Sequence, residues 1–182
     1  MDNGASSYRR FLDGDESAMD EIMRELFFPL VFFVNRYLND LPAAEDVAMD
    51  AMTELFVHKR RYHFKVSLKT YVFMLGKSRA LNYLKHRKAL RETELTEAEA
   101  LAEESELERR ALDSERKRAV NAALARLPED QRMAVHLIYF EELSYEEAAR
   151  VMRKDRKQVD NLLYRAKKSL RAMLGEEGEE LL

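Results

Sequence analysis

Glycine and proline are scarce in this chain, and their scarcity limits the folds that the chain can adopt. Only 5 Gly and 3 Pro occur among 182 residues, which is too few turn-forming residues for a sheet protein of this length. Residues with high helix propensity, chiefly Ala, Leu, Glu, Lys, Arg and Met, are abundant instead. The sequence therefore predicts an all-α fold and excludes most β folds.

Composition excludes several further classes of protein. With 46% hydrophobic and 36% charged residues, the chain is too apolar for general disorder and too charged for a membrane protein. The absence of Cys excludes a disulfide scaffold, a thiolate zinc site and a Cys nucleophile. The N-terminus lacks the pattern of a signal peptide, and the most apolar stretch, residues 27–34, is too short to span a bilayer. We therefore expect a cytoplasmic protein without membrane insertion.

Charge is strongly segregated along the chain, although the formal net charge is only −3. Residues 1–58 carry a net charge of −8 and residues 92–115 another −8, whereas residues 59–91 carry +11 and contain no acid. The last part, residues 116–182, carries +2. The near-neutral total therefore conceals a strongly basic segment and says little about whether the chain binds nucleic acid.

An acidic segment at residues 92–114 separates two helical regions. It contains no aromatic residue and few apolar residues other than Ala and Leu, so it cannot bury a core of its own. We therefore predict an all-α protein of two small helical domains, at residues 1–91 and 115–175, joined by an acidic linker at 92–114. Residues 176–182 are predicted to form a short acidic tail.

Apolar residues at three- and four-residue spacing predict three helices in the first domain. The first covers residues 26–38, and Pro29 within its pattern predicts either a kink or a helix start near that point. Its buried face is predicted to contain Leu26, Phe27, Leu30, Val31, Val34 and Leu38. The second begins after Pro42, and its buried face is predicted to contain Val47, Ala51, Leu55 and His58, opposite an acidic face of Glu45, Asp46, Asp50 and Glu54. The third runs from about Leu68 to Ala89, and its buried side is predicted to contain Val72, Leu75, Leu81 and Leu84.

The basic segment at residues 59–91 also contains many aromatic residues: Tyr62, Phe64, Tyr71, Phe73 and Tyr83. Bases next to exposed aromatic rings are typical of proteins that bind single-stranded nucleic acid, because cations neutralise phosphates while rings stack on bases. The alternative is a solvated basic face with the aromatic residues in the core. The composition of this segment alone leaves both interpretations open.

The second domain contains the pattern of a helix-turn-helix. One helix is expected after Leu127-Pro128, with Ala134, Leu137 and Ile138 facing inward. Ser144 precedes Glu147 by three residues, which is the spacing of a capping box at the start of the next helix, with Ala148, Val151 and Met152 inward. After a short turn, Asp155 can cap a last helix whose apolar stripe is Val159, Leu162, Leu163, Ala166 and Leu170.

The outer face of this last helix is basic. Residues 150–171 contain nine bases and two acids. At about 100° per residue, the side chains farthest from the apolar stripe are Lys157, Asn161, Tyr164 and Lys168, flanked by Arg156, Arg165 and Arg171. Arg and Lys can pair with guanine edges and Asn or Gln with adenine, so this composition is typical of a helix that reads the DNA major groove. The alternative is a helical hairpin with a solvated basic face.

These patterns resemble those of the bacterial RNA polymerase sigma factors, in particular the extracytoplasmic-function group. In the second domain the resemblance rests on Leu127-Pro128, Arg132, residues 144–149, Val159 and residues 165–171. In that family they belong to a helix-turn-helix that binds the minus-35 promoter element. The resemblance implies minus-35 contacts by Arg156, Lys157, Asn161, Tyr164, Arg165 and Lys168. Glu142 departs from the family pattern, because a Gly is frequent there in the turn before Ser144.

The first domain resembles the same family. Ala44-Glu45-Asp46-Val47 together with Asp50 is similar to a family motif whose acidic helix docks on the clamp helices of the largest polymerase subunit. This implies polymerase binding by Glu45, Asp46 and Asp50. Phe64 and residues 71–84 resemble the segment that melts and captures the minus-ten element. This implies minus-ten contacts by Phe64, Lys65, Lys69, Tyr71, Lys77, Ser78 and Asn82.

The resemblance covers nearly the whole chain and implies a sigma factor that binds core RNA polymerase and directs promoter-specific initiation. Its expected partners are core RNA polymerase and promoter DNA, with an anti-sigma protein as a further candidate. A plain helix-turn-helix regulator with an N-terminal dimerisation or sensing domain is the alternative. It would explain the second domain equally well but would leave the basic aromatic segment and the acidic helix before it without a role.

An enzyme is the contrasting hypothesis, and the sequence offers it little. The four His residues, at positions 58, 63, 86 and 136, show no spacing with carboxylates that is typical of a metal site. The five Gly residues form no phosphate-binding loop. We therefore predict no catalytic residue, no metal and no cofactor.

Overall fold

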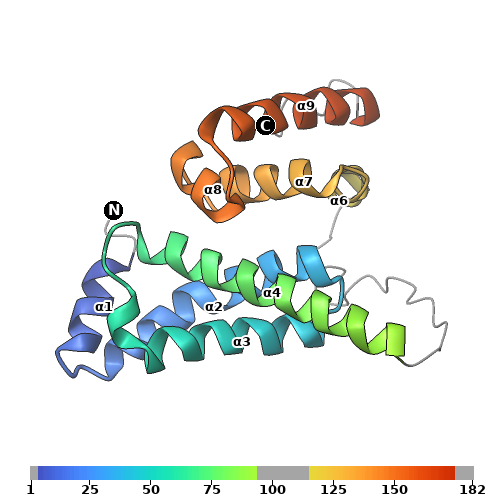
Figure 1. Cartoon of the computed structure of the whole chain (residues 1–182). Helices are drawn as coiled ribbons and strands as arrows, with labels where there is room; N and C mark the ends of the chain where they lie inside the picture. The colour runs from blue at the N-terminus through green and yellow to red at the C-terminus, as the bar shows by residue number, and fades with distance from the viewer. Residues whose placement is uncertain (1–3, 94–114, 175–182) are drawn as a thin grey trace. The chain divides into compact units, whose positions relative to one another are not determined.

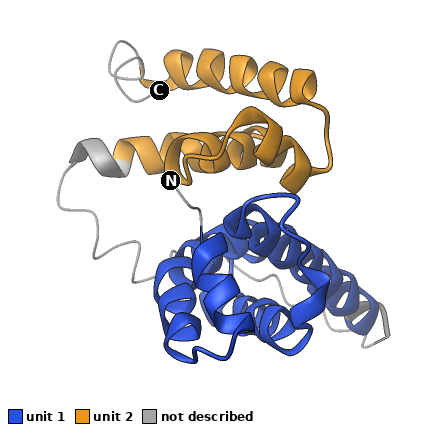
Figure 2. Ribbon diagram, turned by 90° about the vertical axis from the view of Figure 1, so that its left-hand side faces the viewer, with its two compact units in different colours: residues 1–103 blue, residues 104–182 orange. Residues whose placement is uncertain are grey.

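The computed structural model describes residues 4–93 and 115–174, and within these ranges the secondary structure is helical, without strands (Figure 1). This confirms the predicted all-α fold. The chain divides into two compact units, residues 1–103 (unit 1) and 104–182 (unit 2) (Figure 2). Apart from its first two positions, the predicted acidic linker lies outside the described residues, as does the predicted tail at 176–182.

Unit 1 is built around three long helices. These are α2 (Ser17–Leu38), α3 (Leu41–Val57) and α4 (Leu68–Thr93), and each packs against the other two. A short helix, α1 (Ala5–Leu12), packs against α2, and a 3₁₀ turn, η1 (Lys59–Arg61), follows α3. The sequence predicted the three long helices but not α1, because its eight residues contain too few apolar positions for a helical period to be visible.

The start of α2 corrects the prediction for residues 26–38. This helix begins at Ser17 and continues through Pro29, so Pro29 does not mark its start. Five of the six residues predicted on its buried face are buried: Leu26, Leu30, Val31, Val34 and Leu38. Phe27, which was predicted on the same face, is only half-buried. Pro29 lacks a backbone N–H and so costs the helix one hydrogen bond, but the neighbouring Leu30 and Val31 are almost fully buried. Packing of the apolar face therefore keeps the helix continuous through the proline.

Hydrogen bonds at the junction between α2 and α3 fix the second long helix. The Asp40 carboxylate accepts a hydrogen bond from the Ala43 N–H at 3.2 Å, which is the usual cap at a helix N-terminus. The Asp40 N–H in turn donates to Oδ1 of the buried Asn35 at 2.9 Å. As predicted, Val47, Ala51 and Leu55 are buried on α3. His58, which was predicted on the same face, is exposed, because α3 ends at Val57 and the chain leaves the helical path there.

The buried side of α4 differs from the predicted one. Val72 is fully buried as expected, but Leu81 is 42% exposed and Leu75 and Leu84 are only half-buried. The buried line instead runs through Leu68, Val72, Gly76 and Ala80 at four-residue spacing. A Cβ atom at Gly76 would lie 2.5 Å from Leu30 Cδ1, so α4 approaches α2 closely at this point. The spacing of large apolar residues did not reveal this side of α4, because its buried line passes through the small residues Gly76 and Ala80.

Unit 2 contains α6 (Glu115–Ala125), α7 (Glu129–Val135), one π-helical turn η2 (His136–Phe140), α8 (Tyr145–Met152) and α9 (Arg156–Leu174). Pro128 is the N-cap residue of α7, in agreement with the predicted helix start. Packing of α6, α7 and α8 against α9 encloses a core in which Met133, Leu137 and Val151 are at most 1% exposed. Ile138, predicted to face inward, is only half-buried.

Candidate promoter and polymerase interfaces

Two reciprocal caps fix the hairpin formed by α8 and α9. Ser144 Oγ accepts a hydrogen bond from the Glu147 N–H at 3.2 Å, and Glu147 Oε2 accepts one from the Ser144 N–H at 3.0 Å. This confirms the predicted capping box. At α9, Asp155 Oδ1 accepts from the Gln158 N–H at 2.7 Å, and Gln158 Oε1 accepts from the Asp155 N–H at 2.9 Å. Both helix starts are therefore determined by local hydrogen bonds.

The turn between these two helices is short and has a left-handed residue. Arg153 has a φ angle of 56°, and the N–H of Lys154 donates to the Ala149 carbonyl at 2.9 Å. This arrangement satisfies a free carbonyl at the end of α8, and residues 153–155 connect the two helices. The sequence predicted a turn of this length, and α8 and α9 pack directly against one another. The hairpin is therefore a helix-turn-helix.

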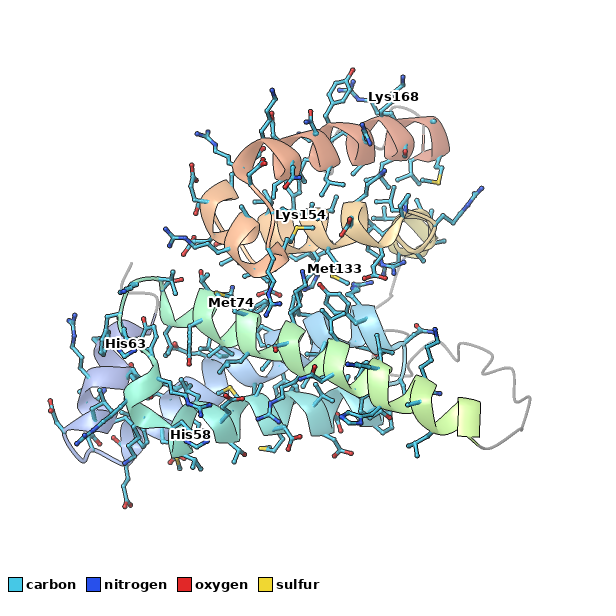
Figure 3. All side chains as sticks on the ribbon, in the orientation of Figure 1. His58, His63, Met74, Met133, Lys154 and Lys168 are labelled. Carbon is cyan, nitrogen blue, oxygen red and sulfur yellow. The ribbon has the colours of Figure 1, made fainter. Side chains whose placement is uncertain are left out.

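The two faces of α9 are sharply different. Val159, Leu163, Ala166 and Leu170 are buried, which confirms the predicted apolar stripe except for Leu162, which is half-buried. The side chains predicted for minus-35 contacts are all exposed: Arg156, Lys157, Asn161, Tyr164, Arg165 and Lys168. Figure 3 shows Lys168 on the side of α9 away from α7. The structure therefore presents the predicted DNA-contacting side chains on the outside of one helix.

Not every base of unit 2 faces outward. Lys154 Nζ pairs with Asp130 at 3.0 Å, and Lys167 Nζ lies 5.3 Å from the centroid of the Tyr139 ring. Arg156 forms an ion pair with Glu146 at 3.3 Å, but both side chains are more than half exposed, so water screens this pair strongly. Of the bases on α9, Lys167 is therefore directed toward Tyr139, whereas Lys157, Arg165 and Lys168 are exposed on the outer face.

The acidic residues of α3 divide into two groups. Asp46 and Asp50 are exposed and lie one helical turn apart, and Glu45 beside them is half-buried. Glu54, predicted on the same acidic face, is turned into the bundle, and its side chain is only 16% exposed. It accepts hydrogen bonds from Arg79 of α4 at 2.8 Å and from Arg61 of η1 at 2.9 Å. The pKa of Glu54 is lowered, most strongly by its hydrogen bonds with Arg79. The positive charge of Arg79 and the hydrogen bond and charge of Arg61 lower it further.

The aromatic residues of the basic segment are neither all exposed, as binding of single-stranded nucleic acid would require, nor all buried in the core. Tyr62 and Phe73 are buried in the core, whereas Phe64, Tyr71 and Tyr83 are half-buried. The Tyr62 hydroxyl donates to the Val66 carbonyl at 2.7 Å, and the Tyr62 ring lies 4.7 Å from that of Phe64 and 5.1 Å from that of Tyr71. Burial raises the pKa of Tyr71, and the charge of Glu54 adds to the effect. Phe64 and Tyr71 thus each pack against a buried ring and are themselves partly accessible.

The polar residues predicted for minus-ten contacts do not share one face of α4. Tyr71, Ser78 and Asn82 fall within about 40° of one another around the helix. Lys69 falls about 140° away from Asn82. Its Nζ lies 5.8 Å from the ring centroid of the buried Phe73. Lys65, in the loop before α4, is exposed, and Lys77 is half-buried. Tyr71, Ser78 and Asn82 therefore form a common surface, and Lys69 and Lys77 both lie outside it.

Sequence reasoning missed the part that α1 plays near these residues. Tyr8 of α1 is fully buried, and its ring lies 5.2 Å from that of Tyr62. The guanidinium carbon of Arg9 lies 4.9 Å from the centroid of the Phe64 ring. The only available signal was the spacing of Tyr8 and Phe11 by three residues, which is too short to establish a helical period.

Within the described ranges, no group of three or more His, Cys, Asp or Glu side chains could hold a metal ion. His58, His63 and His86 are exposed. His136 is buried, and its Nε2 lies 3.3 Å from Oε1 of the buried Glu141. Among residues 4–93 and 115–174, no helix is both long enough and apolar enough to cross a bilayer.

Comparisons with known proteins agree with these features. Residues 117–170, which contain the helix-turn-helix, match the family described as Sigma-70, region 4. The chain is 26% identical over 160 residues to the ECF RNA polymerase sigma factor SigM of Bacillus subtilis, covering 85% of this chain and 94% of that protein. It is 27% identical over 172 residues to the ECF RNA polymerase sigma-E factor of Escherichia coli, covering 88% of each.

Solved structures share the fold. The sigma factor RpoE of Bartonella quintana, solved in complex with the anti-sigma factor NepR, superposes with a TM-score of 0.66 at 21% identity over 86% of this chain and 96% of that one. CnrH, solved in complex with the cytosolic domain of CnrY, gives a TM-score of 0.63 at 17% identity over 94% of both chains. The chain therefore contains a Sigma-70 region 4 domain around its helix-turn-helix, and along most of its length it is similar to RNA polymerase sigma factors of the extracytoplasmic-function group.

Proposed function

We propose that this protein binds core RNA polymerase reversibly and directs initiation at particular promoters, without catalysing a reaction itself. The observation that carries the proposal is the region 4 match on a helix-turn-helix whose second helix exposes a basic and amide-containing face. A sigma factor works where polymerase works, so we place the protein in the cytoplasm. The similarity along the first unit favours this function over a plain helix-turn-helix regulator, in which that unit would serve dimerisation or sensing.

The outer face of α9 is the proposed minus-35 interface. Lys157 and Asn161 lie near the N-terminal end of the helix, which enters the major groove in helix-turn-helix proteins, and are proposed to contact base edges. Arg165 and Lys168 lie farther along the helix and are proposed to contact phosphates. Arg156 and Tyr164 complete the surface, and all these side chains are exposed. Because the caps at Ser144 and Asp155 fix both helices, this face is ordered before DNA binds.

The proposed minus-ten interface is formed by the loop before α4 and the outer side of α4. Phe64 and Tyr71 are half-buried and are proposed to stack on unpaired bases, since base stacking on aromatic rings tolerates any sequence. Ser78 and Asn82, on the same side of α4 as Tyr71, are proposed to hydrogen-bond to the captured strand. Lys65, exposed in the loop before α4, is proposed to neutralise phosphates at this interface. Lys69 and Lys77 lie off the surface that Tyr71 shares with Ser78 and Asn82, and they are proposed to contact phosphates beside it.

The proposed polymerase-docking surface is the exposed acidic part of α3. Asp46 and Asp50 project from one side of the helix and present two negative charges to a basic partner surface, with Glu45 at their edge. Glu54 is not included, because Arg79 and Arg61 already neutralise it. An anti-sigma protein is a further candidate partner, since the sigma factor RpoE of Bartonella quintana was solved in complex with one.

Transcription in vitro with purified core polymerase tests the proposed function. The protein should support initiation from a defined subset of a genomic promoter library, whereas core polymerase alone should not. The double variant Lys157→Ala/Asn161→Ala, which changes only the outer face of α9, should still bind core polymerase but lose the preference for particular promoters. If the wild-type protein binds DNA but never supports promoter-dependent initiation, it is a plain regulator and the proposal is wrong.

A further inference from the structure

The short helix α1 closes one end of unit 1 over the segment that connects α3 and α4 (Figure 1). Tyr8 is the centre of this contact. Its hydroxyl donates, in a shared hydrogen bond, to the backbone carbonyl of Leu55 in the last turn of α3 at 3.0 Å and to that of Lys59 in η1 at 3.1 Å. Burial raises the pKa of Tyr8 to about 12. The contact therefore fixes the path of the chain as it leaves α3.

The same contact extends to the loop that carries Phe64. The Tyr8 ring packs edge-on against Tyr62 at 5.2 Å and against Phe64 at 6.1 Å. Phe64 itself has a φ angle of 56°, in the left-handed region that a bulky side chain adopts only at an energetic cost. Such a conformation persists only where surrounding contacts hold it. Tyr8 and Tyr62 provide part of that support.

Arg9 also contacts the Phe64 ring. Its guanidinium carbon lies 4.9 Å from the centroid of the Phe64 ring, within the range of a cation–π contact. The next residue, Arg10, points elsewhere and pairs with Asp15 at 2.6 Å and Glu21 at 2.9 Å. The two adjacent arginines of α1 therefore have different contacts, and of these two only Arg9 lies on the ring of Phe64, the residue with the left-handed backbone.

We propose that Tyr8 and Arg9 are positioning residues for promoter melting: they hold the Phe64 ring in the orientation in which it receives an unpaired minus-ten base. This inference rests on the proposed function, and it adds α1 to the DNA-binding part of unit 1. A guanidinium group that lies on an aromatic ring keeps the ring from rotating. The exposed Lys59 and Lys65 add positive charge to the same end of the unit.

The test compares Arg9→Ala with Arg10→Ala in the holoenzyme assembled from the full-length protein and core polymerase. Each variant removes one positive charge from α1, but only the first removes the contact with Phe64. The probe is a single-stranded minus-ten oligonucleotide with a fluorescent base analogue at the position to be captured. Arg9→Ala should weaken its binding about two- to fivefold, which corresponds to one cation–π contact at an exposed site. Arg10→Ala should bind the probe like the wild type, because exposed ion pairs contribute little. Equal losses for both variants would reduce the effect to net charge and overturn the proposal.

A double-mutant cycle with Phe64→Ala separates positioning from an independent contact. If Arg9 acts through the ring, Arg9→Ala should cause no further loss in the Phe64→Ala background. Additive losses would mean that Arg9 contacts DNA by itself, and the proposal would be wrong.

Tyr8→Phe keeps the ring but removes the two hydrogen bonds, and it should also weaken probe binding while leaving core binding unchanged. A wild-type holoenzyme that does not bind the probe would contradict the proposed function, whereas normal binding by Arg9→Ala would contradict only the present inference.

Discussion

Substitution of Asn161 by Ala should relax the sequence preference at the upstream promoter element, whereas substitution of Lys168 should weaken all promoters alike. At a rise of about 1.5 Å per residue, Asn161 lies about 6 Å beyond Lys157 along α9, and Lys168 about 10 Å beyond Asn161. The major groove is about 12 Å wide, so a helix that enters it by its N-terminal end brings Lys157 and Asn161 to the bases. Lys168 then lies near the phosphates at the groove edge.

The expected magnitudes follow from these positions. Asn161→Ala removes an amide that can pair with an adenine edge, so discrimination at one or two base pairs should fall by about 1–3 kcal/mol. Lys168→Ala removes one phosphate contact, so the salt dependence of binding should decrease by about one unit of slope with little change in preference. Both side chains are exposed, and neither substitution should change the free energy of unfolding by more than about 0.5 kcal/mol.

The assay selects promoters from a library with a randomised upstream element, using holoenzyme that contains each variant, and sequences the products at two salt concentrations. Wild type and Lys168→Ala should select the same sequences with different yields, while Asn161→Ala should accept additional bases. If the Lys157→Ala/Asn161→Ala double variant selects the same sequences as the wild type, the assignment of base-reading and phosphate-contacting positions on α9 is wrong.

Three further predictions concern other parts of the molecule. Reversing Asp46 and Asp50 to Lys should abolish binding to core polymerase in a pull-down without loss of the helical circular-dichroism signal, and reversing the exposed Asp20 of α2 is the control. Glu142→Gly should raise the free energy of unfolding by about 0.5–1 kcal/mol in urea denaturation, because Glu142 has a φ angle of 54° and Gly adopts this conformation without strain. A lower urea midpoint than that of the wild type would contradict this. Because its arginine partners lower the pKa of Glu54, its stabilising contribution should be present above the ordinary value of 4.5 and lost as the pH falls below it, and Glu54→Gln should flatten that part of the stability profile.

The sequence alone was sufficient to predict the helix-turn-helix. The capping box at Ser144, the cap at Asp155 and the stripe through Val159 and Leu163 depend on residues three or four positions apart. Such contacts form within one helical turn, so a single segment of sequence contains everything that determines them. The outer face of α9 follows directly, because it is the side opposite a stripe that must be buried.

Only the tertiary structure decided which residues of unit 1 remain accessible. Periodicity placed Glu54 with Asp46 and Asp50, but arginines from η1 and α4 draw it into the bundle. Periodicity also favoured Leu81 as a core residue, whereas the close approach of α2 and α4 at Gly76 puts the buried line elsewhere. The position of α1 over the 62–66 loop depends on contacts between residues about fifty positions apart, such as the hydrogen bonds from the Tyr8 hydroxyl. A helical pattern defines the side chains on each face, but which face is buried depends on the helices that pack against it.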